Sequence, residues 1–168
     1  MFAVATVRYV DGRWSEPTIV GADGWVINGC PVNGPAVAAD EARVAVAWFS
    51  APEDKGRVQV AFSSDSGGRY GAPVRVDDGR PIGRVDVALL PGGEALVSWL
   101  EQATSGAEVR ARTVSPSGRR GGALTVAPSS EARSSGFPRL ERAGGEVVLA
   151  WRDAADPPRV RSGVIELR

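Results

Sequence analysis

The apolar residues of this chain fall in short runs that repeat about every 50 residues. Three runs end in tryptophan, at 44–48, 95–99 and 147–151, and their tryptophans lie 51 and then 52 residues apart. A second apolar run and a turn rich in Gly, Pro or Asp precede each, which is typical of a β-hairpin. A third run follows each of them, and two units add a fourth. Four short strands in a repeat of this length are typical of a β-propeller blade.

The repeats divide the chain into complete and partial blades. Residues 35–76 and 84–127 each fit four strands, whereas 136–168 fits three. Residues 1–21 fit the two outer strands of a further blade, at 2–10 and 14–20. About three blades cannot close a ring, because the smallest propellers have about four. The sequence therefore predicts an open all-β arc, which is either part of a longer protein or closed by self-association.

A turn between the third and fourth strands of the first complete blade carries a specific motif. It reads Ser63-x-Asp65-x-Gly67-x-x-Tyr70. Ser and Asp side chains bind backbone amides in turns, and glycine accepts positive φ. The motif resembles the Asp box of sialidases and related propellers, in which the aromatic residue plugs the turn.

This resemblance covers the whole chain and implies a sialidase-like propeller. The chain looks similar to the C-terminal half of bacterial exo-sialidase-like proteins, which are often exported. Six blades are usual in that family, so a six-bladed or similar ring made by a homo-oligomer is expected, and a dimer is favoured. The Asp box of the family lies away from its catalytic face, so the motif indicates architecture more than activity.

Composition removes several kinds of chemistry. The chain has no His and one cysteine, Cys30, which excludes Ser-His-Asp and Cys-His mechanisms, an intramolecular disulfide and the usual zinc sites. We expect no metal and no cofactor. The 20 basic and 20 acidic residues balance without blocks of one sign, so neither nucleic acid nor a membrane is expected as a partner. No export signal or membrane span is evident in the sequence, and the compartment stays open.

Candidate site residues lie in the loops that gather on one face of a propeller, around its axis. The polar residues expected nearest the axis are Asn28, Asn33, Arg84, Asp86, Glu101, Arg139, Arg152 and Asp153. Each also has a simpler interpretation. Arg84 and Asp86 fit an ion pair along one strand, and Glu101 fits a solvated loop tip. Cys30, in the loop before the first complete blade, is either a buried apolar residue or a thiol in the channel.

The resemblance implies roles for some of these residues. Sialidases bind a carboxylate with three arginines, for which Arg84, Arg139 and Arg152 are the candidates here. Their nucleophilic Tyr is activated by a Glu and works with an Asp acid/base, which makes Glu101, Asp86 and Tyr9 weak catalytic candidates. Asp153 and Asn33 complete the expected ligand-binding set. Trp25 joins it as the one tryptophan in a Gly-rich loop on that face, where it would stack on a sugar.

Three functions remain open at this stage. The first is a noncatalytic sialidase-like module that binds carbohydrate or protein at the pore face. The second is an exo-α-sialidase or related glycoside hydrolase, with a site completed by another copy or by further sequence. The third is a structural fragment whose only function is to assemble into a propeller.

Overall fold

The computed structural model describes residues 1–27, 29, 32–153 and 155–167. Within them the chain forms fifteen β-strands, two short 3-10 helices and no α-helix. Two antiparallel sheets have four strands and one has three. The predicted all-β class with four-stranded propeller units is therefore confirmed. No helix in this described part is long and apolar enough to cross a membrane.

The first four-stranded sheet follows chain order, so each strand pairs with the next. Its strands are β5 (Ala36–Asp40), β6 (Arg43–Ser50), β7 (Arg57–Ser63) and β8 (Val74–Arg75). The tight β5–β6 turn has Glu41 at a φ of 54°, which matches the turn predicted there. A 3-10 helix, η1 (Pro52–Asp54), joins β6 to β7.

The second four-stranded sheet repeats this plan with longer strands. They are β9 (Pro81–Leu89), β10 (Ala95–Gln102), β11 (Ala107–Val114) and β12 (Leu124–Ser129). The predicted Pro-Gly-Gly turn joins β9 to β10, with Gly93 at a φ of 83°. Pairing between β9 and β10 shifts register opposite Trp99, where Gly83 and Arg84 both have positive φ. The sequence pattern did not predict this bulge.

The third sheet has three strands, in the order expected for the incomplete blade. They are β13 (Arg139–Ala143), β14 (Glu146–Arg152) and β15 (Val160–Glu166). A second 3-10 helix, η2 (Arg133–Ser135), lies in the connection from β12 to β13.

The two strands predicted at the N-terminus are each broken in two. β1 (Val4–Thr6) pairs with β4 (Thr18–Gly21), and β2 (Tyr9–Val10) pairs with β3 (Arg13–Trp14). The interruption lies beside Pro17, which has no N–H for a strand ladder. There the amide of Arg8 donates to Ser15 Oγ at 3.0 Å instead.

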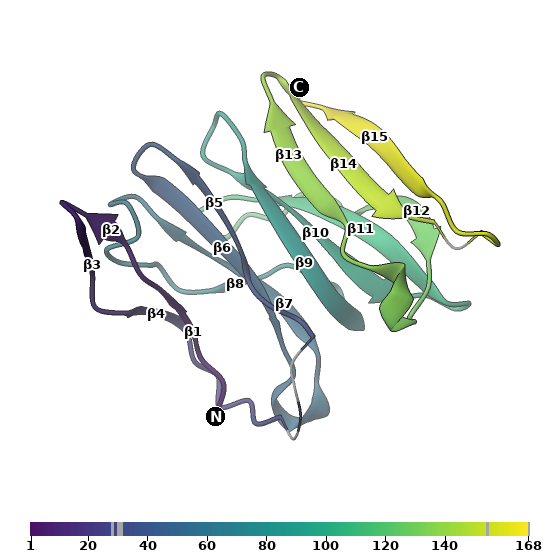
Figure 1. Ribbon diagram of the computed structural model, residues 1–168, viewed down its shortest axis with the longest axis horizontal. Coiled ribbons are helices and arrows are strands. Elements are labelled where there is room, and N and C mark those ends of the chain that lie inside the picture. Colours follow the sequence, from purple (N-terminus) through teal and green to yellow (C-terminus); the bar gives the residue numbers. More distant parts are fainter. Residues whose placement is uncertain (28, 30–31, 154, 168) are drawn as a thin grey trace.

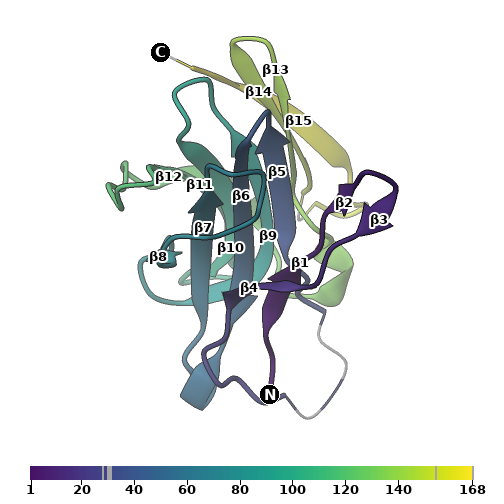
Figure 2. The ribbon, with the colours of Figure 1, turned by 90° about the vertical axis from the view of Figure 1, so that its left-hand side faces the viewer.

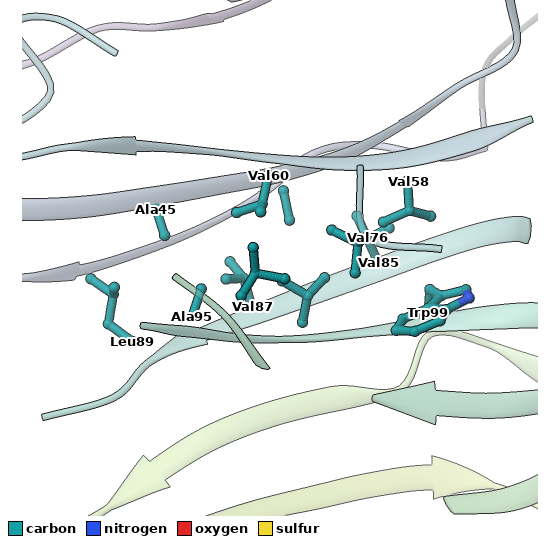
Figure 3. Close-up of a cluster of buried hydrophobic side chains, with 12 residues drawn as sticks. Ala45, Val58, Val60, Val76, Val85, Val87, Leu89, Ala95 and Trp99 are labelled. Atoms are coloured by element: carbon teal, nitrogen blue, oxygen red, sulfur yellow. The ribbon is translucent and has the colours of Figure 1, made fainter. Parts of the chain in front are cut away.

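The layers pack face to face in chain order, as Figures 1 and 2 show. Between the first two sheets lies a core of valine, alanine and leucine side chains with Trp99, drawn in Figure 3. Val58, Val60 and Val97 in this core are fully buried. Each such side chain contributes about 1.5–3 kcal/mol relative to exposure, so these interfaces fix the angle between blades.

The recurring tryptophans occupy equivalent places. Trp48 packs against the N-terminal strands, Trp99 against the first sheet and Trp151 against the second, so each faces the layer that precedes it in the chain. The arc has two uncovered ends. On β15, Val160 and Val164 are 80% and 56% exposed, and on β4 Ile19 is 58% exposed.

Candidate functional site

The innermost strands of the three sheets form one wall. β5, β9 and β13 are each an edge strand of their sheet, and β9 contacts both of the others. Residues 37–40, 86–89 and 139–142 of these strands line a hollow of about 290 Å³. We call these residues the inner wall. In a propeller this is the side that faces the axis, where ligands commonly bind.

Asp86 is the best-connected carboxylate of the inner wall. It is buried, and its Oδ2 accepts a hydrogen bond from the Leu140 amide at 2.8 Å and pairs with Arg139 Nε at 3.2 Å. Its Oδ1 accepts a hydrogen bond from the Val87 amide. The expected ion pair between Asp86 and Arg84 is not formed, because Asp86 instead joins the second sheet to the third.

A second carboxylate of the wall, Asp40, joins the first sheet to the third. Its Oδ2 lies 2.7 Å from Arg43 Nη2 and 3.6 Å from Arg142 Nη2. The third carboxylate, Glu141, is exposed and forms no ion pair with any residue that the structure describes. The wall thus presents alternating positive and negative groups, most of them already paired.

Arg84 lies near the wall but does not open onto it. Its side chain is buried, and its guanidinium donates to Ser135 Oγ and to the carbonyls of Glu131 and Ala132. No carboxylate among the described residues pairs with it. Burial lowers the pKa of Arg84, although arginine stays protonated in proteins. The positive φ of 54° turns this side chain toward the η2 connection.

Asn33 holds the bulge that carries Arg84. Its Oδ1 accepts from the Arg84 amide at 2.9 Å, and its Nδ2 donates to the Ile82 carbonyl at 3.1 Å. A Cβ at Gly83 would lie 2.7 Å from the Asn33 amide group, so only glycine fits there. The structure therefore brings the predicted residues Asn33 and Arg84 together, in a structural contact.

The three candidate arginines have separate partners. Arg152 donates from Nη1 to the Ser134 carbonyl, so Arg84 and Arg152 both bind the η2 connection. Arg139 is 72% exposed and pairs with Asp86. These bonds occupy guanidinium groups that a three-arginine carboxylate clamp would use.

Glu101 is neither a loop tip nor a free base. It lies in β10 and is 5% exposed. Its Oε2 accepts from Trp99 Nε1 and its Oε1 from the Arg80 amide, both at 2.6 Å. The sequence could not indicate this, because the bond from the Arg80 amide depends on how the strand end folds against the β8–β9 connection.

Asp153 organises the β14–β15 connection. Its carboxylate accepts from the Arg159 amide and from Arg161 Nε, both at 2.9 Å. These hydrogen bonds, that of Arg159 first, lower the pKa of Asp153. Asp153 therefore holds the two sides of this connection together.

Of the two aromatic candidates, Trp25 is buried, although it was expected to be accessible to a sugar, and Tyr9 is exposed. Trp25 is 9% exposed and packs between Phe2 and Phe49, with ring centroids 5.3 and 5.8 Å away, so a sugar cannot stack on it. Tyr9 is 63% exposed and lies against Trp14 on the N-terminal hairpin. Asn28 and Cys30 lie outside the described residues.

The Ser63–Tyr70 turn lies at the end of β7, beside the β5–β6 turn. Ser63 Oγ accepts from the Gly67 amide at 2.9 Å and donates to Asp65 Oδ1 at 2.7 Å. The pKa of the Asp65 carboxyl group is lowered, mainly by the hydrogen bond that the Arg69 amide donates to it. Tyr70 packs against the core around Trp48. The η2 connection contacts the start of β9, at the opposite end of the strands.

The sequence reasoning missed the acids that link adjacent elements. Asp40, Glu141 and Arg142 of the inner wall were not singled out, although all three lie at or near the end of a first strand. Asp77 and Asp78, which bond to the Val58 amide and to Arg112, were not singled out either. Among the described residues, no group of three or more acidic or cysteine side chains is arranged to hold a metal ion.

Comparison with known proteins gives the fold. No protein-family model and no curated protein matches the sequence. Xylan β-1,4-xylosidase from Bacillus halodurans aligns with a TM-score of 0.55 and 9% identity, over 97% of this chain and 37% of that chain. A mutant of NanB sialidase from Streptococcus pneumoniae aligns with a TM-score of 0.49 and 11% identity, over 98% of this chain and 26% of that chain. A mutant of the GH43 protein BlXynB from Bacillus licheniformis aligns with a TM-score of 0.48 and 11% identity, over 77% of this chain and 27% of that chain.

The likeness to the xylosidase shows a β-propeller architecture. The chain spans between 26% and 37% of the length of these three proteins. At 9% identity the alignment with the xylosidase establishes the fold and not an activity. Membership of the sialidase-like Asp-box family stays a prediction.

Proposed function

We propose that this chain is a noncatalytic, carbohydrate-binding segment of a glycoside-hydrolase-like propeller. The observation that carries the proposal is the inner wall, a polar hollow formed by three blades at the axis. Arg139 pairs with Asp86 through Nε alone and is 72% exposed, so its two Nη groups can donate to sugar hydroxyls, and the exposed Glu141 can accept from them. Hydrogen bonds with charged groups are the stronger ones in such sites.

The noncatalytic part of the proposal rests on how the candidate acids are bound. Glycoside hydrolysis normally needs two carboxyl groups that flank the scissile bond. Both oxygens of Asp86 and both of Glu101 already accept hydrogen bonds within the protein. Tyr9 lies on an exposed hairpin, stacked on Trp14. None of these three groups is free and adjacent to a second catalytic partner.

Calorimetric titration with xylotriose and 3′-sialyllactose tests the binding. Replacing the wall residue in Arg139→Ala should weaken binding of the preferred sugar by about tenfold, because one charged donor is lost. Arg159→Ala is the matched control, since Arg159 is exposed and its side chain has no described ion pair. If neither sugar binds at millimolar concentration, or if the control loses as much affinity, the proposal is wrong.

A catalytic alternative has one observation in its favour. Asp86 and Glu141 both line the inner wall, from adjacent sheets, and further sequence or another copy could add the missing groups. Release of 4-methylumbelliferone from its sialoside, or of 4-nitrophenol from its β-xyloside, tests it. Hydrolysis that is lost in Glu141→Gln would support this alternative over the noncatalytic function.

A second copy is the partner that we propose for the open ends of the arc. Between neighbouring layers the apolar faces are buried in cores, whereas Val160 and Val164 at one end and Ile19 at the other are exposed. Exposed apolar faces and unpaired strand edges favour association. If the chain assembles but binds no sugar, the purely structural function is supported.

A further inference from the structure

A cleft larger than the hollow of the inner wall lies elsewhere in the molecule. It is a cleft of about 830 Å³ between the first two sheets, at the end where the β6–β7 and β8–β9 connections meet. We call it the interblade cleft. Its lining residues are Asp54, Lys55, Gly56, Arg57, Gln59, Arg75, Asp78, Gly79, Arg80, Pro81, Ile82 and Gln102.

The charges of the interblade cleft are unbalanced. Four basic and two acidic side chains line it. One of the two acids, Asp78, is already neutralised by Arg112, whose Nη1 donates to Asp78 Oδ1 at 2.9 Å. Among the basic side chains, Arg75 pairs with Asp77 and Lys55 with Glu53, which leaves two arginines, Arg57 and Arg80, against Asp54.

Two of these cations have unused donors. Arg57 is half-buried at the start of β7, and Arg80 is exposed in the β8–β9 connection. Neither guanidinium forms an ion pair or hydrogen bond with a described residue, whereas Arg75 is engaged by Asp77. A planar guanidinium with free donors suits bidentate recognition of a carboxylate.

The backbone that carries both arginines is fixed by buried acids. Asp77 is 1% exposed, and its Oδ1 accepts from the Val58 amide, next to Arg57, at 2.7 Å. Glu101 accepts from the Arg80 amide, and the Arg80 carbonyl accepts from the Gln102 amide at 2.9 Å. The two arginines therefore project from rigid positions, which lowers the entropy lost when a ligand binds.

We propose that the interblade cleft binds an acidic oligosaccharide through its carboxylates, with Arg57 and Arg80 as the recognising residues. The amides of Gln59 and Gln102, which also line the cleft, are suited to the sugar hydroxyls. This site shares no residue with the inner wall, so it stands or falls separately from the proposed function.

Calorimetric titration of the whole chain with trigalacturonate tests the proposal. The double variant Arg57→Gln and Arg80→Gln should weaken binding by about tenfold or more, because two charge-assisted contacts are lost. Binding to the unaltered chain should weaken as salt is raised, since these groups are partly exposed. Arg13→Gln is the matched control, because Arg13 is an exposed arginine that lies outside the cleft.

Folding is not expected to confuse the result, because neither arginine side chain bonds to a described residue, and a thermal melt of each variant checks this. Maltotriose provides a neutral sugar and inorganic phosphate an anion without a sugar. The proposal is overturned if trigalacturonate does not bind to the unaltered chain. It is also overturned if the double variant and the Arg13→Gln variant bind trigalacturonate with the same affinity. Equal binding of maltotriose or of phosphate overturns the assignment to an acidic sugar.

Discussion

The substitution Glu101→Gln separates a structural role of Glu101 from a catalytic one. The carboxylate accepts from two donors, Trp99 Nε1 and the Arg80 amide, each at 2.6 Å. Glutamine has nearly the same shape but one acceptor oxygen and an NH₂ group. One of the two donors must therefore face another donor.

The magnitude follows from burial. Trp99 is fully buried, so its indole N–H has no water to replace the lost acceptor. A lost hydrogen bond to a charged group costs about 1.5–3 kcal/mol, and an unpaired buried donor costs about 1–3 kcal/mol. Because these costs overlap in part, we expect the free energy of unfolding to fall by about 2–4 kcal/mol. For a chain of this size that lowers Tm by about 5–15 °C.

Urea unfolding followed by tryptophan fluorescence and circular dichroism measures the change, with both probes required to agree. Glu146→Gln is the matched control, because Glu146 is exposed and has no described ion pair, and it should stay within about 0.5 kcal/mol. If Glu101→Gln also unfolds within that margin, the carboxylate is not a structural acceptor and the reasoning is refuted.

Three further predictions concern the turn, the pH dependence and the assembly. Ser63→Ala should lower the free energy of unfolding by about 1–2 kcal/mol, because the buried Gly67 amide loses its acceptor. The neighbouring substitution Ser64→Ala should leave the free energy of unfolding unchanged. Equal losses of stability for the two variants in chemical denaturation would contradict the role of Ser63. The hydrogen bonds from Arg112 lower the pKa of Asp78 in the folded protein, so its contribution is present above the ordinary value of about 3.9 and is lost as pH falls through the folded pKa. Asp78→Asn should thus lower the free energy of unfolding by about 1 kcal/mol at pH 7, since this side chain is 45% exposed. Urea unfolding at several pH values measures the difference in stability between the variant and the unaltered chain. A difference that did not shrink below about pH 4 would disprove the linkage. Light scattering at several concentrations should give a discrete dimer, whereas a stable monomer would count against closure by a second copy.

Much of the fold could be predicted because its signals are local. Alternating and continuous apolar runs predicted β6, β10 and β14, and the turns at Glu41 and Gly93 were correctly placed. The N-terminal strands were predicted too long, because Pro17 and the bonds of Ser15 interrupt their pairing. The bulge at Arg84 was missed, since it depends on Asn33, which lies 51 residues earlier in the sequence.

The candidate site was predicted less well than the fold. The sequence put Arg84, Asp86, Glu101 and Arg139 near the axis, but each of them also bonds to a residue that lies 21 to 54 positions away in the sequence. Asp86 binds the amide of Leu140, 54 residues away, instead of Arg84. Trp25 was expected on the surface, but Phe2 and Phe49 cover it.

The sequence by itself determined an all-β chain of four-stranded repeats, because strand periodicity, glycine turns and recurring tryptophans act over a few residues. Only the tertiary structure decided which polar groups are free. Hydrogen bonds within the protein occupy Glu101 and Arg84, whereas Arg57 and Arg80 keep unused donors in the interblade cleft. A charge becomes available to a ligand only when packing leaves it without a partner, and that depends on residues that are distant in the sequence.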